Sequence, residues 1–171
     1  MNKSSVFFAF SFLALLAMAC QVEAATVKQL PNDMQMRPVG WKSGTIPFKI
    51  GQVTVDDIDG GVITGILAND IYLQPWNSKS SIGFAGNTPV EFERAGGVLK
   101  GHIAVQTSLR VVNSNRWITC IKLSPVTFGY DGGVSSGVIA FDMELTTPEG
   151  ITRQYKANTL VNFNGKGQVE S

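Results

Sequence analysis

The 171-residue sequence is poor in the groups on which most enzyme sites and nucleic-acid surfaces depend. It contains one histidine, two cysteines and only 16% charged residues, with 14 basic side chains against 13 acidic ones. A single histidine excludes metal sites built from several imidazoles, and the small net charge leaves no basic excess for binding nucleic acid. Glu and Lys, which usually cover helix surfaces, are scarce, whereas glycine and β-branched residues are frequent. This composition predicts an all-β protein.

The first 24 residues have the layout of a secretory signal peptide. Lys3 precedes a largely apolar run over residues 6–19, and small residues before position 25 fit the pattern at which signal peptidases cleave. The run is too short for a transmembrane helix, which needs about 20 apolar residues. We therefore expect residues 1–24 to be removed and the mature chain to be secreted, outside the cell or, in a bacterium, in the periplasm. The sequence leaves open whether Cys20 is removed with this peptide or lipidated.

Cleavage after position 24 leaves a single cysteine, Cys120, in the mature chain. No disulfide bond can then form within the domain, so its stability must come from packing. Cys120 lies in an apolar, β-prone segment over residues 117–123, which predicts a buried and unreactive thiol.

A motif of two glycines followed by valine occurs three times at a constant interval of 36 residues, at 60–62, 96–98 and 132–134. From each glycine pair, further columns continue in register. The shared columns are Gly65/Gly101/Gly137, Leu67/Ile103/Ile139, Ala68/Ala104/Ala140 and Leu73/Leu109/Leu145. This regularity predicts three tandem 36-residue repeats that begin at residues 60, 96 and 132.

Each repeat is expected to contain a hairpin, because a short β-prone segment precedes each glycine pair by three or four residues. The hairpins are predicted at 52–73, 89–111 and 125–145, with further strands at 45–50, 82–84, 117–123 and 151–163. Together they predict a single β domain over residues 45–164, as an antiparallel meander barrel or a two-sheet sandwich, with a β-trefoil or β-prism as the alternative. We expect an irregular N-terminal arm over residues 25–44 and a polar C-terminal tail over residues 165–171.

The strand after each glycine pair alternates between apolar and polar residues, which predicts one buried and one solvent-facing side. The glycine at the same inward position in all three copies predicts a β-bulge or a close approach between layers. The side expected to be buried carries Ile63, Gly65, Leu67, Ile71 and Leu73, then Leu99, Gly101, Ile103, Val105 and Leu109, then Gly137, Ile139, Phe141, Met143 and Leu145.

Three features resemble catalytic or metal sites, and ordinary structure explains each of them better. The Gly-x-Ser-x-Gly motif around Ser135 opens a strand, whereas a nucleophile elbow must lead into a helix. His102 is apolar in the other two copies, which indicates a partly exposed sheet residue. Asp56, Asp57 and Asp59 do not match the spacing of an EF-hand loop and fit turn chemistry. We therefore expect no catalytic residue, no metal and no cofactor.

The aromatic residues are the best candidates for ligand binding. Trp76 lies in a loop over residues 74–78, beside Tyr72 and Asn77, and aromatic faces suit the apolar faces of sugar rings. We expect a secreted, non-enzymatic domain that acts as a recognition, adhesion or assembly module. Its partner would be a protein or carbohydrate surface, or a second copy of the chain paired through a sheet edge. The alternatives are a barrel-type carrier of a small apolar ligand and a carboxylate-based enzyme that uses Asp70 and Asp142.

Overall fold

The computed structural model describes residues 24–170. The predicted signal peptide, apart from residue 24, and Cys20 lie outside the described residues. The described residues form seventeen strands and no helix, as the composition predicted. The strands are β1 (Ala25–Leu30), β2 (Met34–Met36), β3 (Ile46–Phe48), β4 (Gly51–Asp56), β5 (Val62–Ile66), β6 (Ile71–Leu73), β7 (Ile82–Phe84), β8 (Pro89–Phe92), β9 (Val98–His102), β10 (Thr107–Arg110), β11 (Trp117–Cys120), β12 (Pro125–Phe128), β13 (Val134–Val138), β14 (Met143–Thr146), β15 (Thr152–Tyr155), β16 (Leu160–Phe163) and β17 (Val169–Glu170).

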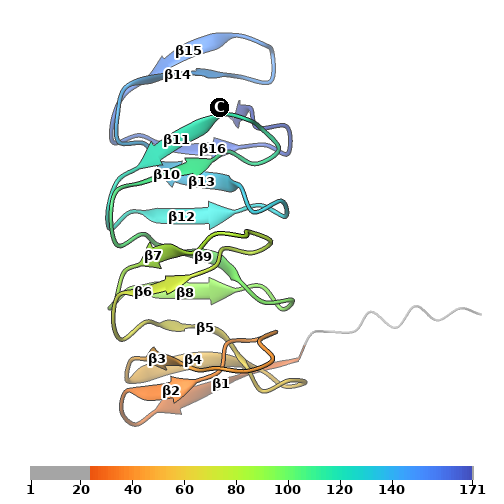
Figure 1. Cartoon of the computed structure of the whole chain (residues 1–171), viewed down its shortest axis with the longest axis vertical. Coiled ribbons are helices and arrows are strands. Elements are labelled where there is room, and N and C mark those ends of the chain that lie inside the picture. The colour runs from red at the N-terminus through yellow and green to blue at the C-terminus, as the bar shows by residue number, and fades with distance from the viewer. Residues whose placement is uncertain (1–23, 171) are drawn as a thin grey trace, which may run out of the picture.

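Nine strands form one large antiparallel sheet in the order β1-β4-β5-β8-β9-β12-β13-β16-β17. The other eight form four two-stranded sheets, β2-β3, β6-β7, β10-β11 and β14-β15. The chain alternates between the two kinds of sheet, so that hairpins of the large sheet and small hairpins stack along the long axis (Figure 1). The isolated bridges Phe48–Leu67, Phe84–Ile103 and Cys120–Ile139 join the layers at intervals of 36 residues.

The large sheet is open, and the predicted barrel is wrong. Strands β1 and β17 are the two ends of the strand order, and no pairing among residues 24–170 joins them. The linear stack in Figure 1 also differs from the threefold arrangement that a β-trefoil or β-prism requires. A sandwich is the nearest of the predicted architectures, with the four small sheets in place of a continuous second sheet.

The predicted irregular arm and polar tail both contain strands. All six residues of β1 pair with β4, from Ala25 opposite Asp56 to Leu30 opposite Gly51, and β2 pairs with β3. At the other end, β17 pairs with β16 and buries Val169. These segments look irregular in the sequence because they lie at the ends of the stack, where only one neighbouring strand is available and few apolar residues are needed.

The core lies between the large sheet and the small sheets, and the layers approach closely at three glycines. A Cβ atom added to Gly65 would lie 2.7 Å from Cδ1 of Phe48, and one added to Gly101 would lie 2.7 Å from Cδ1 of Phe84. At Gly137 the corresponding neighbour is the Sγ atom of Cys120, again at 2.7 Å. The close approach expected from the sequence is therefore present.

A β-bulge interrupts the predicted alternation at the start of β5, β9 and β13. The register shifts at Thr54/Val55, Glu91/Phe92 and Thr127/Phe128, so the first strand residue and the glycine three positions later both face inward. Ile63 and Leu99, which we expected to be buried, occupy the bulge and are half-buried. Val105 and Phe141 were also expected in the core and are 54% and 59% exposed, because they lie in bends that lead to the small sheets.

Candidate functional site

A row of polar side chains crosses the outer face of the large sheet, which is the face that points away from the small sheets. Directly opposite residues in antiparallel strands project to the same side of a sheet. The register places Thr54 opposite Thr64, Thr64 opposite Glu91, Glu91 opposite Lys100, and Lys100 opposite Thr127. These five residues form the polar row, which spans strands β4, β5, β8, β9 and β12.

A second row lies beside the first on four of these strands. Its members come two residues after the polar residue on β5 and β9 and two residues before it on β8 and β12. Ile66 pairs with Pro89, and His102 pairs with Pro125. We call these four residues the proline row. Because neighbouring same-side residues on one strand are about 6.7 Å apart, the two rows run side by side at roughly that separation.

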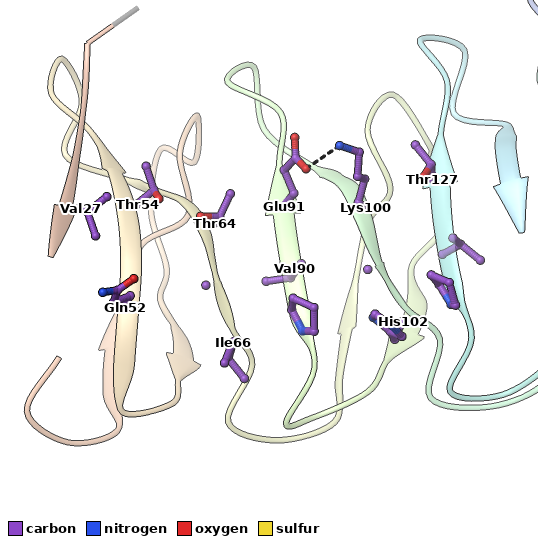
Figure 2. A pocket seen from close by; sticks show the side chains of 15 residues that line it. Val27, Gln52, Thr54, Thr64, Ile66, Val90, Glu91, Lys100, His102 and Thr127 are labelled. Atoms are coloured by element: carbon purple, nitrogen blue, oxygen red, sulfur yellow. Dashed lines mark hydrogen bonds and ion pairs between the residues drawn. The ribbon is translucent and has the colours of Figure 1, made fainter. Parts of the chain in front are cut away.

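A groove lies between the polar row and the proline row. The intervening residues Gly65, Val90, Gly101 and Val126 are buried on the core side, so the groove floor consists of their backbone. Figure 2 shows the polar row beside Ile66 and His102 of the proline row, with Val27 and Gln52 at the β1 end. The groove encloses about 490 Å³. With strands about 4.8 Å apart, it extends for about 19 Å from β4 to β12.

The charged groups of the groove neutralise each other. The Nζ atom of Lys100 lies 2.8 Å from a carboxylate oxygen of Glu91, and both side chains are partly exposed. An exposed pair of this kind contributes little to stability, about 0–1 kcal/mol, so its residues remain available for contacts with a ligand. The groove therefore offers hydroxyl groups and one neutralised ion pair on one side, and mainly apolar side chains on the other.

His102 is half-buried in the proline row, which matches the expected sheet position. Its Nδ1 atom is buried and has no hydrogen-bond partner among the described residues. A histidine that acts as a general base is usually oriented by an acceptor on its second nitrogen. The His102 ring forms part of the wall of the groove.

The residues predicted to bind a ligand lie elsewhere, at the small sheet β6-β7. Tyr72 and Asn77 line one depression of about 440 Å³ together with Trp41. Tyr72 is 74% exposed, and the side chain of Asn77 donates a hydrogen bond of 2.7 Å to the carbonyl oxygen of Tyr130. Trp76 does not line this depression and is half-buried. The structure thus brings two of the three predicted residues together.

Asp59 and Asp131 close equivalent turns at two levels of the stack. Asp59 accepts hydrogen bonds from the backbone N–H groups of Gly61 and Gly40 and pairs with Arg37 at 3.3 Å. Asp131 does the same with the N–H groups of Gly133 and Asn113, and its carboxylate lies 2.9 Å from Arg110. Burial alone would raise the pKa of both carboxyl groups, but these amides and arginines together hold each pKa below its usual range.

The remaining reactive groups also have structural roles. Burial raises the pKa of the Cys120 thiol to about 12, so the group is protonated at neutral pH. Asp70 accepts a hydrogen bond from the N–H group of Gly86, whereas Asp142 pairs with Lys156 and accepts one from Ala157. Each aspartate thus holds a different loop. Ser135 lies in the β13 bulge and continues the strand instead of entering a helix.

Sequence reasoning missed the groove because its rows depend on sideways pairing between strands distant in sequence. Strand β5 pairs with β8 only after the chain has formed the small sheet β6-β7. One available signal was the pair of prolines at equivalent positions, Pro89 and Pro125, followed two residues later by Glu91 and Thr127. This spacing places a proline and a polar residue on the same side of each strand.

Comparison with protein-family profiles, curated proteins and solved structures gives no match for this chain. Across residues 24–170, no helix has the length and apolar character needed to cross a membrane.

Proposed function

We propose that this chain is a secreted, non-enzymatic binding module and that the outer-face groove holds its ligand. The observation that supports this function best is the groove itself, whose volume of about 490 Å³ falls in the range of ligand sites, roughly 300–1,000 Å³. Its paired charges favour an uncharged ligand, since Glu91 and Lys100 already neutralise each other. Its length favours an elongated molecule that lies across the strands.

The β1 edge of the large sheet favours ligand recognition over assembly through strand addition. Thr26 and Lys28 pair with the buried residues Val55 and Val53, so they project to the core side of β1 although both are exposed. An inward-pointing charge on an edge strand opposes the docking of a further strand. Such a charge is typical of an edge that is protected against pairing.

The tightly packed interior favours surface recognition over an enclosed carrier. Phe48 and Phe84 lie so close to the glycines of the facing sheet that an added methyl group would overlap with their rings. The two phenylalanines are completely buried. Space for a ligand is therefore better provided by the outer face than by the region between the layers.

We infer that the three units arose by tandem duplication and that the duplication created the rows of the groove. The bulges at Thr54/Val55, Glu91/Phe92 and Thr127/Phe128 support this origin, because they occur at spacings of 37 and 36 residues. Repetition places residues of similar size at the same height on successive hairpins. A groove that crosses several hairpins is a direct consequence of such stacking.

The proposed function is tested by titrating ¹⁵N-labelled protein with uncharged elongated probes, namely a neutral β-glucan hexasaccharide, a neutral α-glucan hexasaccharide and octyl glucoside. We expect saturable shifts of the amide resonances of Gly65, Val90, Gly101 and Val126, which form the groove floor. The variant Thr64→Arg should abolish these shifts by filling the groove, whereas Thr152→Arg, an exposed strand position on β15, should not. Saturable binding of none of the probes, or equal binding by Thr64→Arg, would contradict the proposal.

A further inference from the structure

A cleft lies between the loop that joins β6 to β7 and the small sheet β10-β11, and it adjoins the depression lined by Tyr72, with which it shares Asn77 and Ser78. It encloses about 440 Å³ and is separate from the outer-face groove, with which it shares no lining residue. Its lining includes the buried side chains of Leu109 and Phe128 and the half-buried Ile82. The cleft therefore has an apolar base of a size that one or two sugar rings would cover.

Trp117 lines this cleft and is 59% exposed, although it is one of the largest apolar side chains of the protein. It stands opposite Arg110 in the β10-β11 pair. The residues 36 positions before and after it are Ser81 and Arg153, and both are exposed. The stack therefore does not need an aromatic residue at this position for packing. An exposed indole beside an apolar base provides a flat surface on which a ring can stack.

Hydrogen-bonding side chains line the same cleft as the indole. Asn77, Ser78, Ser80 and Ser108 are each at least partly exposed. Some of their groups already have partners, since the Asn77 amide donates to the Tyr130 carbonyl, the Ser78 hydroxyl bonds to the backbone of Ser80, and the Ser108 hydroxyl bonds to that of Thr119. The remaining donor and acceptor positions suit the hydroxyl groups of a sugar. Asn77 is also one of the residues that the sequence indicated for ligand binding.

The cleft carries a surplus of one positive charge. Arg110 is neutralised by Asp131 at 2.9 Å. Lys79 lines the same cleft and is exposed, and within residues 24–170 its ammonium group has no ion-pair partner. A ligand that stacks on Trp117 and carries one negative charge would therefore complement the cleft.

We propose that this cleft binds a hexuronic acid unit, with the apolar face of the sugar ring on Trp117 and its carboxylate at Lys79. The hydroxyl groups of the ring contact the serine and asparagine side chains. This site is independent of the proposed groove function, since the two surfaces have no residue in common. Each site can therefore fail without the other.

The test compares methyl β-glucuronide with methyl β-glucoside, two probes that differ only in a carboxylate and a hydroxymethyl group. The indole N–H resonance of Trp117, assigned from its loss in Trp117→Phe, is followed during titration of the labelled mature chain. We expect saturable binding of the glucuronide in the millimolar range, binding of the glucoside weakened about fivefold or more, and weaker glucuronide binding at high salt.

Three variants separate the contributions. Trp117→Ala, followed through the amide of Ser108, should weaken glucuronide binding about tenfold or more, and Lys79→Gln should make the two probes bind equally. Phe141→Ala and Lys122→Gln change an exposed aromatic residue and an exposed lysine outside the cleft, and should change nothing. Unchanged urea midpoints would show that all variants remain folded.

Two results would overturn the inference. Equal binding of the two probes by the unmodified chain would remove the carboxylate from the proposal and leave a neutral sugar site. Absence of a saturable Trp117 shift with either probe, or full binding by Trp117→Ala, would show that the cleft is not a sugar site. Neither result would affect the groove, whose floor amides report separately.

Discussion

Replacing Gly101 by alanine tests how tightly the two layers of the fold are packed. The new Cβ atom would lie 2.7 Å from Cδ1 and 2.9 Å from Cε1 of Phe84, whereas ordinary van der Waals contacts of a Cβ atom begin at about 3.4 Å. The ring must therefore move by several tenths of an ångström. It cannot move freely, because Phe84 is completely buried and packs edge-to-face against Phe128 at a centroid distance of 6.2 Å.

The expected loss of stability follows from this overlap. Adding a methyl group to a well-packed core destabilises a protein by about 1–3 kcal/mol. For a domain of this size, each kcal/mol lowers the melting temperature by about 2–4 °C, which gives an expected decrease of roughly 2–12 °C for Gly101→Ala. Gly165→Ala is the matched control, because no atom lies within 4 Å of its new Cβ, and it should change stability by less than about 0.5 kcal/mol.

Urea unfolding of four proteins completes the test: the unmodified chain, Gly101→Ala, Phe84→Leu and the double variant. Phe84→Leu removes part of the ring, so the alanine should cost about 1 kcal/mol less in that background. The reasoning would be refuted if Gly101→Ala were as stable as the unmodified chain. It would also be refuted if the alanine cost the same with and without the Phe84 ring, since the cost would then have another source.

Three further predictions concern charge, pH and the sheet edge. Asp131→Asn should lower the free energy of unfolding at neutral pH by about 1–2 kcal/mol. The lowered pKa of Asp131 stabilises the folded chain only while the group is ionised, so this difference should shrink as pH falls below the ordinary carboxyl value of 3.8. A difference in urea midpoints that stays constant with pH would contradict this. The raised pKa of Cys120 should contribute stability that is complete below pH 9 and lost as pH rises towards 12. The free energy of unfolding should therefore fall less in alkali for Cys120→Ala than for the unmodified chain. An identical fall in both proteins would contradict this prediction. Lys28→Val should increase the average mass in sedimentation experiments, because it removes the inward charge that protects β1, and an unchanged mass would argue against that role.

The all-β class, the shared buried columns at Gly101, Ile103 and Leu109, and the close approach at the glycines could be predicted because each depends on residues close together in the sequence. The alternation that begins in β9 and continues beyond it identified Gly101 and Ile103 as inward residues, and the structure buries both. The glycine column predicted a bulge or a close approach at Gly101, but the alternation did not indicate that the bulged residue is Leu99. One extra residue shifts the alternation at Leu99 while leaving the apolar character of the strand unchanged.

The candidate groove was harder to foresee because it depends on which strands become neighbours. A barrel and an open stack have similar hairpins, and they differ in whether the first and last strands meet. In this chain β1 and β17 each pair with one strand only, and the alternation within a hairpin does not indicate which strands become neighbours. Exposure of Trp117 was equally hidden, since its segment is otherwise apolar and β-prone.

The open order of the large sheet has a mechanical consequence. Hydrogen bonds between neighbouring strands run along the long axis of the stack (Figure 1), and β1 and β17 are the first and last strands of the large sheet. Tension applied to the two ends would therefore load these bonds in series and peel the strands apart one after another. Proteins that resist force instead load many such bonds in parallel. A chain of this shape that was anchored at both ends would lengthen in small steps at low force.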